Sequence, residues 1–132
     1  MPGPFIELSG IRVFDVPASG PQLRNGTDAV DLMSAASEYR ATFIVIPVER
    51  LGDDFFDLRT CIAGEMAQKF VMYGRRVAIV GDISRRIAAS KSLAAFVIES
   101  NRGHDLWFVN NLQELVDRLA GYPPRGIDVD PN

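Results

Sequence analysis

The fold of this chain is decided by residues 55–70, FFDLRTCIAGEMAQKF, and by the run RVAIVGD that follows at 76–82. Taken at 100° per residue, the apolar residues of the first stretch share one side, so we predict an amphipathic helix. Its core-facing stripe would be Leu58, Ile62, Met66, Phe70 and Tyr73. We expect Asp53 or Asp54 to cap this helix and Gly74 to end it. The second run is apolar on both alternating faces, which is typical of a buried strand ending in a polar loop.

The rest of the chain continues this alternation. Strand-like runs at 5–8 and 11–16 are separated by Ser9-Gly10, which is a hairpin signal. We predict helices over 27–39, over 90–102, and from Asn110 or Asn111 to Gly121, with strands over 42–46, 77–80 and 106–109. Thr27 or Asp28 would cap the first of these helices, and residues 82–89 are predicted to be a long loop.

The element order β-β-α-β-α-β-α-β-α indicates an α/β fold with a mostly parallel five-stranded sheet. Right-handed crossovers make the later strands parallel, and the first hairpin strand would be antiparallel at an edge. Residues 1–121 are expected to form a single domain, since 132 residues bury a sufficient core. The Pro-rich, acidic residues 122–132 are expected to form a flexible tail.

Composition limits the classes of partner. A net charge of −3 argues against a nucleic-acid surface, because phosphate binding usually needs an excess of basic residues, although a local basic patch is compatible with this charge. The N-terminus lacks the features of a signal peptide, and no apolar run approaches the roughly 20 residues that cross a bilayer. The single cysteine, Cys61, suits a reducing compartment. We therefore expect a cytoplasmic protein that binds neither nucleic acid nor membrane.

Self-association is expected from the strands at 42–46 and 77–80, which are apolar on both faces. If all helices lie on one face of the sheet, the other face needs a cover. A second subunit would supply that cover, so we expect a homodimer.

Several motifs together resemble one family. They are FFDLRT at 55–60, AGE at 63–65, QKF at 68–70, AIVGD-x-S at 78–84, and the run from SKSL-x-x-F to ESNRG between 90 and 103. Over about residues 5–120 the chain resembles the bacterial domain-of-unknown-function family 4180, a resemblance that implies no activity. More loosely, the element order is similar to the STAS domain, the fold of anti-sigma-factor antagonists.

The similarity to STAS domains implies a regulatory site at Thr60. In that family a Ser or Thr at the start of the second helix is phosphorylated and controls partner binding, and Thr60 is its nearest counterpart here. The sequence differs at this point. It has Asp57-Leu58-Arg59-Thr60-Cys61, where the family has Asp followed at once by two hydroxyl residues and Gly.

Polar residues are expected to converge outside the carboxyl ends of the strands, where α/β sheets bind ligands. The loop from Asp82 to Ser92 is the best place for a small anion, because helix N-termini offer unpaired N–H groups. It does not match a phosphate-binding loop, since Gly81 lies ten residues before Lys91. Alternatively, Ser90 and Ser92 cap a helix and the arginines are solvated. The expected binding residues are Asp57, Arg59, Thr60, Glu65, Asp82, Ser84, Arg85, Lys91 and Ser92.

Arg59 has two interpretations. It leans toward the core-facing side of the predicted helix, so it would organise a site if it were held between Asp57 and Asp82. Alternatively, Asp57 and Thr60 are ordinary first-turn residues and Arg59 makes a local ion pair.

The sequence gives little support for a catalytic site or a metal site. A nucleophilic Cys61 would need a base, and the single histidine, His104, lies in a Gly-bounded loop after the third helix. No G-x-S-x-G elbow occurs. A metal site would depend on Asp53, Asp54 and Asp57 without a histidine, so we expect no metal and no cofactor.

Two functional hypotheses remain. The first is a small regulatory or protein-interaction module without catalysis, which binds a protein partner or another copy of itself through the start of the second helix and adjoining loops. The alternative is a binder or enzyme for a small anionic, phosphate-bearing ligand at the carboxyl ends of the strands.

Overall fold

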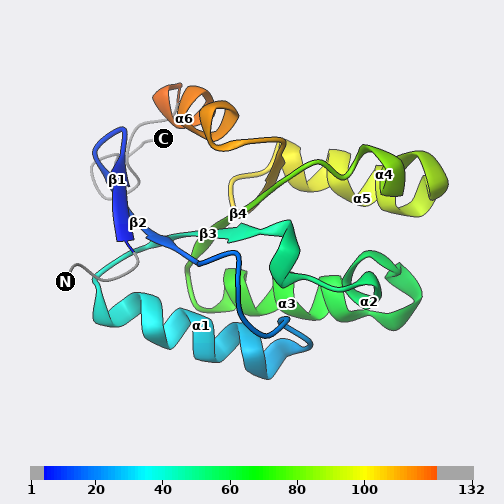
Figure 1. Cartoon of the computed structure of the whole chain (residues 1–132), viewed down its shortest axis with the longest axis horizontal. Coiled ribbons are helices and arrows are strands. Elements are labelled where there is room, and N and C mark those ends of the chain that lie inside the picture. Colours follow the sequence, from blue (N-terminus) through cyan, green and yellow to red (C-terminus); the bar gives the residue numbers. More distant parts are fainter. Residues whose placement is uncertain (1–4, 122–132) are drawn as a thin grey trace.

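A five-stranded sheet runs through the computed structural model, which describes residues 5–121 (Figure 1). Its strands are β1 (Phe5–Leu8), β2 (Ile11–Asp15), β3 (Phe43–Pro47), β4 (Arg76–Val80) and β5 (Leu106–Val109), and their order in the sheet follows the sequence. β1 pairs antiparallel with β2, and the other neighbours pair parallel. The predicted α/β fold with a mostly parallel five-stranded sheet is confirmed. Ser9 (φ 51°) and Gly10 (φ 80°) form the predicted hairpin turn.

The helices lie on both faces of the sheet (Figure 1). They are α1 (Gly26–Glu38), α2 (Asp53–Phe56), α3 (Ile62–Met72), α4 (Ser84–Ala89), α5 (Lys91–Arg102) and α6 (Leu112–Ala120), with 3-10 turns η1 (Val48–Arg50) and η2 (Leu58–Thr60). Because consecutive parallel strands are neighbours, right-handed crossovers put α1, α3 and α5 on the same face. The helix after the last strand, α6, crosses to the other face.

Each face of the sheet has its own hydrophobic core. On the first face, strand residues such as Ile44 and Ile79 pack with Met33 of α1, Met66 of α3 and Leu93 of α5. On the second face, Val13, Phe43 and Trp107 pack beneath Leu115 and Leu119 of α6. All of these side chains are 2% exposed or less. Strands that are apolar on both sides are therefore covered on both sides, as their sequences predicted.

The position of α6 bears on the predicted dimer. That prediction assumed that all helices share one face, and α6 instead covers the second face with the fully buried Leu115 and Leu119. The premise is not met, and self-association stays a prediction without this support. None of the helices between residues 5 and 121 combines the length and apolar character that a membrane crossing requires.

The predicted helix beginning near residue 55 is wrong in its first turns. The chain forms the short α2, then η2, and α3 begins at Ile62. Two residues break the helix: Asp57 is extended (φ −95°, ψ 100°) and Cys61 is left-handed (φ 65°). The core-facing side is correct for Ile62, Met66 and Phe70. Leu58 also packs against the core, although it lies in η2 rather than in the helix, and Tyr73 is 49% exposed.

Smaller differences concern helix ends. The predicted loop at 82–89 contains α4, and Asn25 rather than Thr27 or Asp28 caps α1, with its side chain accepting from the Asp28 N–H. Asn111 caps α6 as predicted, and Glu114 completes the cap by accepting from the Asn110 N–H at 2.7 Å. The predicted tail at 122–132 lies outside the described residues.

Candidate functional site

The carboxyl ends of the parallel strands lie together at one end of the sheet, on the right of Figure 1, where α2, η2 and α4 also lie. Gly81 ends β4 there with φ 150°, and a Cβ at this position would collide with the side chain of Val48 in η1. The chain therefore needs glycine at this position to turn from β4 into α4 beside the end of β3. This close approach packs the loops at this end against each other.

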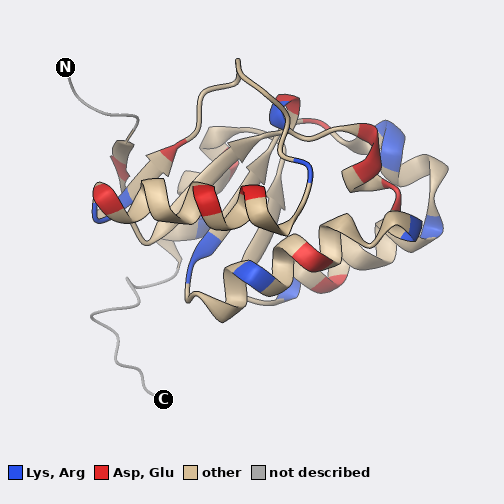
Figure 2. Ribbon diagram, turned by 90° about the horizontal axis from the view of Figure 1, so that it is seen from below, with Lys and Arg blue, Asp and Glu red and all other residues tan. Residues whose placement is uncertain are grey.

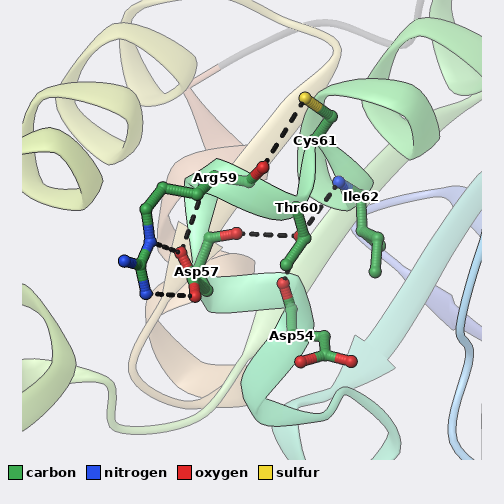
Figure 3. Close-up of polar contacts among 6 residues, drawn as sticks. All are labelled: Asp54, Asp57, Arg59, Thr60, Cys61 and Ile62. Atoms are coloured by element: carbon green, nitrogen blue, oxygen red, sulfur yellow. Dashed lines mark hydrogen bonds and ion pairs between the residues drawn. The ribbon is translucent and has the colours of Figure 1, made fainter.

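Asp57 and Arg59 form a compact turn between α2 and α3 (Figure 3). The Asp57 carboxylate accepts from the Arg59 backbone N–H at 3.1 Å, from Arg59 Nε at 3.0 Å and from Arg59 Nη2 at 2.9 Å. These hydrogen bonds lower the pKa of Asp57, those of the guanidinium having the largest effect and that of the backbone N–H the next. Asp57 is therefore ionised at neutral pH.

Thr60 closes the same turn (Figure 3). Its hydroxyl lies 2.7 Å from the carbonyl oxygen of Asp54 and 2.8 Å from that of Asp57, and it accepts from the Ile62 N–H at 3.3 Å. The hydroxyl proton is thus shared between two backbone acceptors. Thr60 has a structural role in joining α2 to α3, and its oxygen is directed toward backbone rather than toward a ligand.

The expected arrangement of Arg59 between Asp57 and Asp82 is not found. Arg59 pairs with Asp57, and its side chain is 91% exposed, so it does not lean toward the core. Asp82 instead accepts from the Ser84 N–H at 2.9 Å, at the start of α4. That hydrogen bond is the main cause of the lowered pKa of Asp82, with further contributions from the Ser84 side chain and the charge of Arg85.

Arg86 joins α4 to α2, although it is not among the expected binding residues. Its Nη2 donates to Asp53 Oδ1 at 2.9 Å across 33 residues of sequence, and its guanidinium lies 4.4 Å from the ring centre of Phe56. Phe56 is buried, and the Arg86 side chain is 40% exposed. The position of Arg86 two residues after Ser84 does not predict this contact, because both residues lie on α4 and the partners of Arg86 lie on α2.

A cleft of about 370 Å³ separates η2 from the start of α5. It brings together three of the expected residues, Asp57, Arg59 and Ser92, and adds Ser90 to them. Ser90 caps α5 by accepting from the Leu93 N–H at 3.1 Å, as one of the alternatives predicted. Phe56, Leu58 and Ala89 complete the lining.

The remaining expected residues are divided between two places. Ser84, Arg85 and Lys91 are exposed on α4 and at the start of α5, the two helices that meet beside the cleft, but they do not line it. Glu65 is separate, because it packs against α1: a Cβ on Gly26 would lie 2.7 Å from Glu65 Oε2. A carboxylate at the N-terminus of α1 interacts favourably with the helix dipole. Glu65 therefore stabilises the α1–α3 contact rather than joining the cleft.

Cys61 and His104 lie at opposite ends of the strands. Cys61 precedes α3, near the carboxyl ends, and His104 precedes β5, at the amino end of that strand. A Cys–His pair is therefore not formed. Within residues 5–121, no three histidine, cysteine, aspartate or glutamate side chains gather in a way that could hold a metal ion.

The family described as a domain of unknown function (DUF4180) matches residues 8–119, most of the sequence. No curated protein and no solved structure matches, so the looser similarity to STAS domains is not confirmed. The match spans β2 to β5 and nearly all of α6, and the chain belongs to the DUF4180 family.

Proposed function

We propose that this chain is a regulatory binding module that recognises a protein partner without catalysing a reaction. The proposed contact surface, called the rim below, consists of α2, η2, α4 and the first turn of α5. The single observation that carries the proposal is the contact of Arg86 with Asp53 and Phe56. It holds two segments far apart in sequence in a fixed relation before any partner binds, which lowers the entropic cost of association.

The charges of the rim support recognition of another protein. Both signs are exposed on it, and the end of the molecule that carries α2 and α4 shows basic and acidic segments side by side (Figure 2). Interleaved charges of this kind select a partner with the complementary pattern and accelerate its association. The exposed charged side chains of the rim and of the loop that leads into α4 are Asp53, Asp54, Arg59, Asp82, Arg85 and Lys91.

The same charges are poorly suited to acid–base catalysis. A catalytic carboxyl group works best with a pKa near the working pH, which burial or a neighbouring negative charge provides. Hydrogen bonds lower the pKa of Asp57 and of Asp82, so both move away from that range. These two carboxylates are better suited to fixing loop geometry and to presenting negative charge.

Site-specific photo-crosslinking tests the proposal directly. Cys61 is exposed beside η2 and is the sole cysteine of the sequence, so a thiol-reactive photo-crosslinker can be attached there without any substitution. In a lysate of the source organism, we expect one discrete crosslinked protein, identified by mass spectrometry. The double substitution Arg59→Glu and Arg85→Glu reverses two exposed charges of the rim, and it should reduce the yield at least tenfold.

A matched control moves the crosslinker to another surface. In a Cys61→Ser, Gln113→Cys variant the probe lies on exposed α6, on the opposite face of the sheet, and should not capture the same protein. Equal capture from both positions, or a yield unaffected by the charge reversals, would show that the rim does not recognise a partner.

A second candidate function rests on the cleft between η2 and α5. Arg59 and the hydroxyl groups of Ser90 and Ser92 line it next to the N-terminus of α5, which suits a small phosphate-bearing ligand. Differential scanning fluorimetry against nucleotides and phosphorylated metabolites tests this alternative. A specific rise in Tm that Arg59→Ala or Lys91→Ala abolishes, and that Arg102→Ala at the far end of α5 retains, would favour the ligand over the protein partner.

A further inference from the structure

The sheet leaves β5 as an edge strand, with β4 on one side and no strand on the other within the described residues. The hydrogen bonds to β4 identify the groups that point away from the sheet. The Val77 N–H donates to the Asp105 carbonyl and the Gly81 N–H to the Val109 carbonyl, so alternate residues face β4. Leu106 and Phe108 therefore direct their backbone N–H and C=O groups outward.

Asn101 occupies the place of a neighbouring strand at Phe108. Its Oδ1 accepts from the Phe108 N–H at 2.7 Å, and its Nδ2 donates to the Phe108 carbonyl at 3.3 Å. A directly opposed residue of an antiparallel strand would exchange the same two hydrogen bonds. The side-chain amide of Asn101 thus imitates a peptide group, and it comes from α5 rather than from a strand.

The neighbouring helix holds Asn101 in this position. Arg118 of α6 donates to the Asn101 carbonyl at 2.8 Å, and its guanidinium stacks 3.9 Å from the ring centre of Trp107. Glu114 of the same helix accepts from the Asn110 N–H, which is the next outward group after Phe108. Two successive outward positions of the edge are therefore already occupied by side chains.

We propose that the outer edge of β5 is a latent self-pairing surface, which Asn101 keeps closed to β5 of a second copy. The sequence of β5, LWFV, has high strand propensity and carries neither charge nor proline, the features that usually protect an edge. Two copies of one edge satisfy each other's outward groups when they pair antiparallel about a two-fold axis. This surface is distinct from the rim, so the inference does not depend on the proposed function.

The variant Asn101→Ala tests the proposal, because alanine removes both hydrogen bonds to Phe108 without adding charge. Hydrogen exchange measured by NMR on the full chain should show the Phe108 amide exchanging at least tenfold faster than in the wild type at low protein concentration. Analytical ultracentrifugation should show a larger species whose proportion rises with concentration over the micromolar range. Asn110→Ala is the matched control: it removes an exposed asparagine side chain from the same edge and should change neither measurement.

A second variant covers the case in which Asn101→Ala does not fold. Asn101→Asp keeps an acceptor for the Phe108 N–H, loses the donor and places a negative charge at the edge. Its second carboxylate oxygen would face the Phe108 carbonyl, so we expect the Phe108 amide to exchange faster than in the wild type. The added charge should keep two such edges apart, so we expect sedimentation to match the wild type. A folded Asn101→Ala protein with wild-type sedimentation would overturn the proposal. So would an Asn101→Asp protein that forms the larger species, because a charge at this edge should prevent pairing.

Discussion

The hydroxyl of Thr60 has one proton and two carbonyl acceptors, those of Asp54 and Asp57, and this geometry bears on the idea of a phosphorylated switch. A phosphorylated Thr60 would place a charge of about −1.5 to −2 where the hydroxyl now donates to backbone oxygens. The modification would have to open the turn between α2 and α3. Thr60 is exposed, but its hydroxyl fastens this turn, so a structural role explains it better than phosphorylation does.

The substitution Thr60→Val tests this role. It keeps the shape of the side chain and removes the donor, so we expect the free energy of unfolding to fall by about 1 kcal/mol. Thr60→Ser retains the hydroxyl and should lose less than half as much. Urea denaturation followed by circular dichroism measures both variants, and equal losses in the two would show that the hydroxyl contributes nothing.

Asp15 is predicted to make stability depend on pH. It follows Ile11 and Val13 on the second face of the sheet, opposite Val45 of β3, and partial burial raises its pKa above the usual value. An acidic group whose pKa is higher in the folded state than in the unfolded state destabilises the folded state when it is charged. Charged Asp15 therefore opposes folding at neutral pH. Asp15→Asn should therefore raise Tm at pH 7, and this gain should disappear below about pH 4, where the aspartate is protonated in both states.

Thermal unfolding of the two proteins from pH 3 to pH 8 measures that gain. Asp57→Asn is a useful contrast, because hydrogen bonds lower the pKa of Asp57 and its charged form supports the fold. Its loss of stability should be present at pH 7 and should diminish as the pH falls below the usual range for aspartate. A gain for Asp15→Asn that does not change with pH would contradict the assignment.

At the scale of the elements, the strands and the longer helices could be predicted because their apolar residues repeat with a clear period. The break between α2 and α3 could not, because Leu58, Ile62 and Met66 continue the helical period straight through it. The turn is decided by side-chain hydrogen bonds of Asp57 and Thr60 to the backbone, which compete with the helix without altering hydrophobic spacing.

The candidate site was predictable in part for the same reason. The topology places the carboxyl ends of the strands at one end of the sheet, so the gathering of Asp57, Arg59 and Ser92 in one cleft follows from the order of elements. The packing of Glu65 against Gly26 and of Arg86 against Phe56 depends on how neighbouring helices meet. Such contacts between elements leave no periodic pattern in a single sequence.

The contact between α4 and α2 gives a prediction at the element scale. Arg86→Ala should lower the free energy of unfolding by no more than about 1 kcal/mol, because the ion pair with Asp53 and the stacking on Phe56 are partly exposed. Its main effect should be local, with amides of α2 and α4 exchanging severalfold faster in hydrogen-exchange mass spectrometry. Arg85→Ala, next to it and without a contact to α2, should leave both segments unchanged, and a similar effect of the two substitutions would refute the link.

At the scale of the whole molecule, the two faces of the sheet are covered by two kinds of helix. Helices that connect parallel strands cover the first face, and α6, which follows β5, covers the second. The helices that connect parallel strands must share a face, because the crossovers have one hand and the strands are consecutive. That rule does not apply to α6, because no further strand follows it within residues 5–121. The apolar pattern of the strands required a cover for the second face, and the sequence could not decide whether α6 or a second subunit provides it.

Trp107 reports on that second face, because it is the sole tryptophan of the sequence and lies in the core beneath α6 with an exposure of 1%. Leu115→Ala creates a cavity next to it and should cost about 2–5 kcal/mol. Met66→Ala on the first face is the matched control, since both side chains are fully buried. Two buried leucines hold α6, which connects no strands within the described residues, so in Leu115→Ala we expect urea to shift Trp107 fluorescence before it reduces the circular dichroism signal. In Met66→Ala the two transitions should coincide, because α3 is joined to β3 before it and to β4 after it along the chain and cannot detach alone. Coincident transitions in both variants would mean that α6 and the sheet unfold as one unit.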